Sequence, residues 1–148
     1  MAEDNSPCPG SFQDGIHVYP LRVYYEDTDA AGIVYYANYL KFAERARTEM
    51  MHLLDVGYRD LVAQHTIAFA VRRVEVDFLA PAKLDDVLEV RTSVTEAAGA
   101  SVTADQVIHR SGDEITRLRV RLACLGPDGR LLRLPPMLRT ALENVIRE

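Results

Sequence analysis

The residues best suited to chemistry lie between positions 23 and 39, in the run VYYEDTDAAGIVYYANY. Three carboxylates, Glu26, Asp27 and Asp29, stand with Gly32 between a strand-like pattern and a helix-like pattern. A carboxylate that faces free N–H groups at a helix start is suited to attack on a carbonyl group. Acidic residues are also common at helix starts simply as caps. Residue types alone leave both interpretations open.

The flanking patterns predict the elements that position this loop. Apolar residues alternate between Tyr19 and Tyr25, which predicts a strand. They then recur at helical spacing from Tyr39 to Leu53, which predicts an amphipathic helix of about five turns. Gly57 is expected to end that helix. The loop with the carboxylates therefore joins a strand to a long helix.

The rest of the chain is mostly strand-like. Alternating patterns separated by turn residues predict four or more antiparallel strands, and a short helix is expected over 137–147. The apolar phase slips at Arg72 and Arg73, which predicts a β-bulge there, because a strand changes its buried face only by inserting a residue. One long helix with an antiparallel sheet indicates an α+β fold in which the sheet wraps on that helix.

Length and composition set further limits. The chain has 148 residues, of which 48% are hydrophobic and 26% charged, which suits one folded domain over 16–148 after a flexible tail over 1–15. The net charge of −5 argues against a nucleic-acid partner. The tail lacks a signal peptide's apolar core, and no apolar run is long enough for a transmembrane segment. Two cysteines make no disulfide framework, so a cytoplasmic location is expected.

Two segments together resemble a known family. The run from Tyr24 to Tyr36 (YYEDTDAAGIVYY), followed by Glu44 to Met50 (ERARTEM), resembles the hotdog-fold acyl-CoA thioesterases. More narrowly, it is similar to the group that includes 4-hydroxybenzoyl-CoA thioesterase and the bacterial Tol-Pal-associated thioesterase. The similarity continues through 69–88 and covers roughly residues 17–139. It implies a hotdog fold and hydrolysis of acyl-CoA to coenzyme A and a free acid.

The resemblance also implies roles for residues in the loop. It puts the catalytic carboxylate, a general base or a nucleophile, at Asp29, and the donor that polarises the thioester carbonyl at the backbone N–H of Tyr36. Gly32, Ile33 and Val34 are expected to line the substrate site. Tol-Pal-associated enzymes commonly carry His where this chain has Tyr36, whereas the hydroxybenzoyl-CoA enzymes resemble this chain there. An aryl-CoA substrate is therefore the first alternative, and a non-catalytic acyl-binding module the second.

Other polar residues receive structural interpretations. Asp27 and Glu26 are expected to accept loop N–H groups or to pair with an arginine, and Asn38 is expected to cap the helix. Glu44, on the helix, is the reserve candidate for the catalytic carboxylate, although a surface ion pair with Arg47 is the commoner role. Because no His or Cys stands at ligand spacing near the acids, we expect hydrolysis without a metal and assign no cofactor.

Basic residues must meet the phosphates of coenzyme A if this interpretation holds. Arg72 and Arg73, at the predicted bulge, are the phosphate-binding candidates. A second basic stripe, formed by Arg117, Arg119 and Arg121, is better explained as a solvated strand face with cross-strand partners such as Asp105 or Glu89.

The predicted architecture also bears on assembly. One helix can cover only one face of a sheet, and a small open sheet leaves edges that can pair. The resembled family builds its pocket between two subunits. We therefore expect a homo-oligomer, either a dimer or a dimer of dimers.

Overall fold

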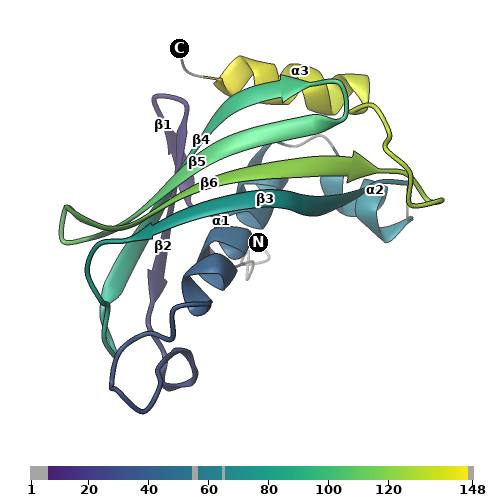
Figure 1. Cartoon of the computed structure of the whole chain (residues 1–148). Coiled ribbons are helices and arrows are strands. Elements are labelled where there is room, and N and C mark those ends of the chain that lie inside the picture. The colour runs from purple at the N-terminus through teal and green to yellow at the C-terminus, as the bar shows by residue number, and fades with distance from the viewer. Residues whose placement is uncertain (1–6, 55–56, 65, 147–148) are drawn as a thin grey trace, which may run out of the picture.

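A computed structural model describes residues 7–54, 57–64 and 66–146 as one antiparallel sheet with helices packed on it (Figure 1). The sheet has six strands in the order β1-β2-β4-β5-β6-β3. Their bounds in that order are Ser11–Gln13, Ile16–Arg22, Val87–Ala98, Ser101–Arg110, Asp113–Leu125 and Ala68–Phe78. The helices are α1 (Asn38–Leu53), α2 (Tyr58–Ala63) and α3 (Pro136–Val145), and a short 3-10 turn covers Tyr25–Asp27. No helix among these residues is long and apolar enough to span a membrane.

The long helix predicted from the apolar period is α1, and the curved sheet lies over it (Figure 1). Phe42, Ala43 and Ala46 on its inner face are fully buried, together with Leu88 and Val90 of β4. The small alanine side chains let the helix approach the sheet closely, while Phe42 fills the space beside them. The expected α+β arrangement of a sheet wrapped on one helix is therefore confirmed.

The four strands after α1 form as expected, including the bulge. The pairing of β3 with β6 shifts register between Val71 and Arg73, which confirms the predicted irregularity. β3 is also an edge of the sheet, since β6 is its single partner among the described strands. Its apolar side chains at Val71 and Phe78 are consequently 52% and 51% exposed. The predicted strand is therefore present, but Val71, Val74 and Phe78 on it stay exposed among the described residues.

The N-terminal part of the chain corrects one expectation. Ser11–Gln13 were assigned to a flexible tail over 1–15, but they form β1, which pairs with β2. The cause is Asp14-Gly15, where both residues adopt positive φ (52° and 77°). Such a pair favours a two-residue hairpin turn, so the first strand is held by a local signal. Residues 1–6 lie outside the described residues, and the domain boundary near residue 16 stays a prediction.

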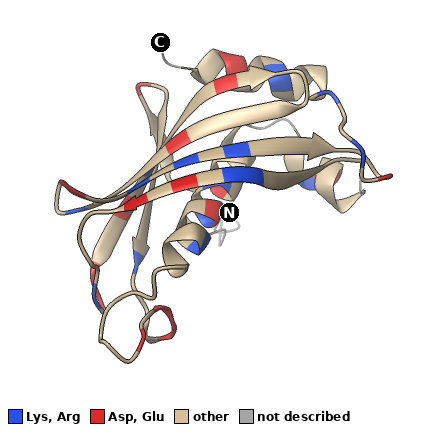
Figure 2. Cartoon of the chain, viewed as in Figure 1, with Lys and Arg blue, Asp and Glu red and all other residues tan. Residues whose placement is uncertain are grey.

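Acidic and basic residues are spread along the strands of the sheet (Figure 2). The Arg119 guanidinium on β6 donates to both carboxylate oxygens of Asp105 on β5, at 2.8 and 3.2 Å, and Arg117 pairs with Glu114. These side chains are exposed, and the cross-strand partner expected at Asp105 is confirmed. The basic stripe on β6 is thus a solvated face whose charges are largely paired.

Candidate active site

Residues 28–34 form a small closed loop between the 3-10 turn and α1. Thr28 and Val34 pair as an isolated bridge, the Asp29 N–H donates to the Ile33 carbonyl at 3.0 Å, and the Gly32 N–H donates to the Asp29 carbonyl at 2.9 Å. Gly32 has φ of +79°, and a Cβ added there would meet nothing within 4 Å. The loop therefore needs glycine for its backbone conformation and not for lack of space.

The Asp29 carboxylate is fixed on one side only. Its Oδ1 accepts the N–H of Ala31 at 2.9 Å, which is the side-chain turn typical of aspartate in loops. Its Oδ2 has no hydrogen-bond partner among the described residues, and the side chain is exposed in the single chain. One oxygen is thus oriented by the backbone while the other is available to water or substrate.

Asp27 holds the loop against the start of α1. It is only 4% exposed, and its two oxygens accept from the Tyr24 N–H at 2.8 Å and from Asn38 Nδ2 at 2.9 Å. The expected structural role of Asp27 as an acceptor of N–H groups is confirmed. Asn38 does not cap the helix as expected, because its side chain is used by Asp27 and the cap position falls on Ala37.

Tyr36 lies just before α1 and does not open it as expected. A turn precedes the helix, in which the Asn38 N–H donates to the Tyr35 carbonyl at 2.8 Å. Within the described parts of the chain, the Tyr36 N–H has no acceptor, as expected. The Tyr36 ring packs edge-on against Phe78, with centroids 6.1 Å apart. The pKa of Tyr35 is raised chiefly by its neighbour Tyr36, and the nearby Asp29 charge adds to this.

A shallow cavity of about 310 Å³ lies beside the loop. Of the predicted substrate residues, Ile33, Val34 and Tyr36 line it, and Gly32 lies on the adjoining loop. Phe78 and Tyr39 also line this cavity and were missed. In the sequence, Phe78 is one apolar residue of a strand pattern, which carries no signal for a site. Arg72 and Arg73 do not line it; they are exposed farther along β3, and Arg73 pairs with Glu75 at 2.9 Å.

The turn after β3 supports the loop from the other side. The Val34 N–H donates to the Ala82 carbonyl, and the Ala82 N–H donates to the buried Tyr39 hydroxyl, each at 2.9 Å. Asp86 stabilises this turn by accepting the Lys83 N–H at 2.8 Å and an Arg110 N–H at 3.0 Å. The Lys83 hydrogen bond first, and then Arg110, lower the pKa of the Asp86 carboxyl. The active-site loop is therefore held from α1 and from the β3–β4 turn.

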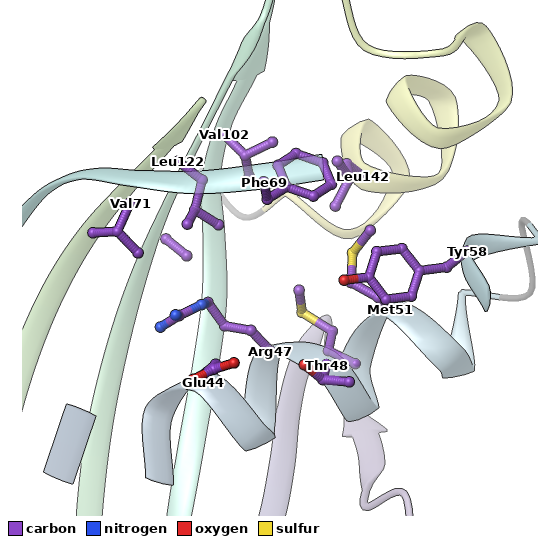
Figure 3. A pocket seen from close by; sticks show the side chains of 12 residues that line it. Glu44, Arg47, Thr48, Met51, Tyr58, Phe69, Val71, Val102, Leu122 and Leu142 are labelled. Atoms are coloured by element: carbon purple, nitrogen blue, oxygen red, sulfur yellow. The ribbon is translucent and has the colours of Figure 1, made fainter. Parts of the chain in front are cut away.

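Glu44, the reserve candidate, lies at a different place. It is an exposed residue of α1 that lines a second cavity, of about 340 Å³, between α1 and the sheet (Figure 3). The surface ion pair with Arg47 is not formed among the described residues, because Arg47 donates to Gln106 Oε1 at 2.9 Å instead. The two acidic candidates thus belong to separate hollows of one chain.

The described residues contain no group of three or more His, Cys, Asp or Glu side chains placed to hold a metal ion. Glu26, which was expected to serve the loop, is exposed and makes no hydrogen bond within these residues. The three acids of the segment are therefore one buried acceptor, Asp27, and two exposed carboxylates, of which only Asp29 is oriented by a hydrogen bond among the described residues.

An antiparallel sheet wrapped around one long helix is the arrangement of a hotdog fold. The sequence profile of the thioesterase-like superfamily matches residues 23–142, and the chain belongs to this family. The resemblance drawn from the loop motif is confirmed.

Individual relatives agree with this assignment. The acyl-CoA thioesterase YbgC of Haemophilus influenzae is 43% identical over 107 residues, which cover 72% of this chain and 79% of that protein. The crystal structure of a probable thioesterase from Bartonella henselae superposes with a TM-score of 0.75 at 34% identity, covering 81% and 99% of the two chains. The 1,4-dihydroxy-2-naphthoyl-CoA thioesterase of Synechocystis gives 0.80 at 25% identity, covering 87% and 96%.

The buried acceptor predicts a stability effect. Asp27→Asn replaces one of the two accepting oxygens by an NH₂ group, which cannot accept a hydrogen bond. The bond from Tyr24 or the bond from Asn38 is therefore lost. We expect Asp27→Asn to lower the free energy of unfolding by about 1–3 kcal/mol in urea denaturation at fixed protein concentration. The exposed neighbour provides the control, since Glu26→Gln should change it by less than about 0.5 kcal/mol. Equal effects of the two variants would contradict the role given to Asp27.

Proposed function

We propose that the chain hydrolyses acyl-CoA thioesters, with Asp29 as the catalytic carboxylate. The observation that carries the proposal is the asymmetric binding of Asp29, whose Oδ1 is held by the Ala31 N–H while Oδ2 has no partner among the described residues. A group that must take a proton or attack a carbonyl needs an oriented carboxylate with one oxygen unengaged. The family of the chain and the acyl-CoA thioesterase activity of the Haemophilus relative support the same reaction.

The reaction can follow two routes from this geometry. As a general base, Asp29 takes a proton from water while the water oxygen attacks the thioester carbonyl; the tetrahedral intermediate then expels the thiolate of coenzyme A, which takes up a proton. As a nucleophile, Asp29 itself attacks and releases the thiolate, and water hydrolyses the resulting acyl anhydride. Both routes give the free acid and coenzyme A, and both develop negative charge on the carbonyl oxygen.

The Tyr36 N–H is the proposed donor to that oxygen. This N–H has no acceptor among the described residues and can donate to the substrate. It lies just before α1, where the positive end of the helix dipole also stabilises negative charge on the carbonyl oxygen. A backbone donor does not depend on the side chain, so the replacement of histidine by tyrosine in this chain is compatible with the role. The ring of Tyr36, together with Ile33 and Val34, is proposed to form the wall near the reacting carbonyl.

Two alternatives keep the same fold. An aryl-CoA substrate is favoured by the aromatic surroundings of the loop. The centroid of the Tyr36 ring lies 4.9 Å from the ring centroid of Tyr35 and 6.1 Å from that of Phe78. The dihydroxynaphthoyl-CoA activity named for the Synechocystis relative belongs to the same chemical class. A non-catalytic acyl-binding module would use the cavity without the reactivity of Asp29. No cofactor enters any of these proposals, and the reducing cytoplasm is the proposed location.

The proposed active form is a homo-oligomer paired through β3. This edge strand has 11 residues and exposes Val71, Val74 and Phe78, whereas β1 at the opposite edge has only 3 residues. A long apolar edge strand pairs readily with a second copy. Pairing would also cover the exposed Asp29 region, and removal of bulk water strengthens electrostatic interactions with the reacting carbonyl. A dimer, or a dimer of dimers, follows.

The first prediction concerns Asp29. We expect Asp29→Asn to lower kcat at least about a hundredfold in a thiol-release assay, because an amide is neither a base nor a good nucleophile. The fold and the oligomer should persist, since Asn can still accept the Ala31 N–H. The matched change on the reserve candidate, Glu44→Gln, should cost much less. If Glu44→Gln is inactive while Asp29→Asn is near normal, the catalytic carboxylate is on α1 and our assignment is wrong.

The second prediction concerns the phosphates of coenzyme A. Arg72 and Arg73 are exposed at the centre of β3, away from the Asp29 loop. Charges that bind the nucleotide contribute similarly to the ground state and the transition state, so the double change Arg72→Ala/Arg73→Ala should raise KM and leave kcat nearly unchanged. The same double change at Arg117 and Arg119 is the control. An increase of KM only in the control would move the phosphate site to β6.

The third prediction concerns assembly. A lysine at the centre of an edge strand opposes pairing, so Val74→Lys should shift the protein toward monomer in sedimentation velocity and lower its activity. The control is Gln13→Lys, which places the same charge on the β1 edge and should leave assembly intact. A wild-type protein that is monomeric and fully active at the assay concentration would refute the proposed pairing.

A further inference from the structure

The second cavity contains a cation in largely apolar surroundings (Figure 3). Its walls come from α1, α2, α3, β3, β5 and β6, and most of the lining side chains are apolar, among them Met51, Phe69, Leu122 and Leu142. Arg47 rises from α1 toward the strands that carry Val71 and Leu122 (Figure 3). A guanidinium is rarely placed in such surroundings unless a partner compensates for its loss of hydration.

A buried polar network holds Arg47 in place. Its Nη1 donates to Gln106 Oε1 at 2.9 Å, and Gln106 is fully buried. The Gln106 amide donates in turn to the Ala43 carbonyl at 2.9 Å and to Thr92 Oγ1 at 3.0 Å. The orientation of the Gln106 amide is thereby set by its two acceptors, which turns Oε1 toward Arg47. The guanidinium is oriented by the sheet and by α1 before any ligand arrives.

The charge of Arg47 is not matched by an ion pair. Within the described residues, its single hydrogen bond goes to a neutral amide, and no carboxylate lies within 4.0 Å of it. Burial lowers the pKa of the guanidinium, and the more distant charge of Glu44 acts in the opposite direction. An arginine nevertheless stays protonated at neutral pH. Several of its N–H donors therefore remain for an anionic group that enters the cavity.

The length of β3 determines which active site this cavity can serve. Phe69, near the start of the strand, lines the second cavity, whereas Phe78, at its end, packs against Tyr36. At about 3.3 Å per residue, the two positions are roughly 30 Å apart, too far for a short acyl group within one chain. In an antiparallel pairing of two β3 edges, the Phe78 end of one chain lies beside the Phe69 end of the other. In such a pairing, each Asp29 loop would face the second cavity of the partner.

We propose that this second cavity receives the far end of the acyl group held at the partner's Asp29, and that Arg47 selects acyl groups ending in a carboxylate. The proposal rests on the proposed hydrolysis and on pairing through β3. The carboxylate of the substrate would supply the counter-ion that Arg47 lacks among the described residues, and a guanidinium can bind it through two parallel N–H donors. Glu44 also lines this cavity, but it does not pair with Arg47 among the described residues, so the guanidinium stays available to the substrate.

The test compares matched substrates. Adipoyl-CoA and suberoyl-CoA carry a terminal carboxylate, and hexanoyl-CoA and octanoyl-CoA have the same chain lengths without it. We expect wild-type kcat/KM to be higher for at least one carboxylated member than for its plain counterpart. Arg47→Met should lower that ratio at least about tenfold, because the carboxylate would be buried without a partner. Arg47→Lys keeps the charge and should retain most of the preference.

A second neutral variant keeps the test possible if the first does not fold. If Arg47→Met does not yield folded protein, Arg47→Gln removes the charge while keeping polar atoms beside Gln106, and the same drop in the ratio is expected. A wild-type protein without preference for the carboxylated member overturns the proposal, as does a neutral variant that lowers both kcat/KM values equally. Failure of the wild-type protein to hydrolyse any thioester would instead refute the proposed function, so the two failures are distinguishable.

Discussion

The position of the loop that carries Asp29 depends on one buried carboxylate, that of Asp27. It joins the backbone before the 3-10 turn to the first residue of α1, through Tyr24 and Asn38. A buried charge is tolerated only when its lone pairs are satisfied, so this pair of hydrogen bonds allows little movement of either segment. Since Asp29 follows two residues later and Tyr36 lies two residues before Asn38, both proposed catalytic groups inherit their positions from Asp27.

The division of the molecule into two hollows follows from the geometry of the sheet. α1 fills the middle of the curved face with Phe42 and two alanines, and the two cavities described above lie toward opposite ends of the helix. One end carries the loop and the aromatic wall, and the other carries Arg47 and the methionines. The uncovered β3 edge connects them. Packing that makes the core dense thus also separates the reacting carbonyl's site from the cavity proposed for the acyl end.

Local patterns predicted much of this fold and part of the site. The helical period identified the buried face of α1, and the phase slip at Arg72 located the bulge. The Asp14-Gly15 turn was equally local but was overlooked. Asn38 was misassigned as a cap because its partner depends on a contact that helix-start rules do not include. The exposure of Phe78 and the bond from Arg47 to Gln106, 59 residues away, depend on tertiary neighbours and have no local signal.

The span of β3 has a genetic consequence if each site draws on two chains. A subunit lacking the Asp29 carboxylate would still provide its Arg47 cavity to the neighbour's site. A subunit lacking Arg47 would still provide its Asp29 carboxylate to its own site. For carboxylated substrates, two alleles, each defective alone, would then restore one complete site when their products mix. The same strand length would prevent either allele from recovering when all subunits carry the same change. The activity would thus depend on which two subunits pair, and not on either subunit alone.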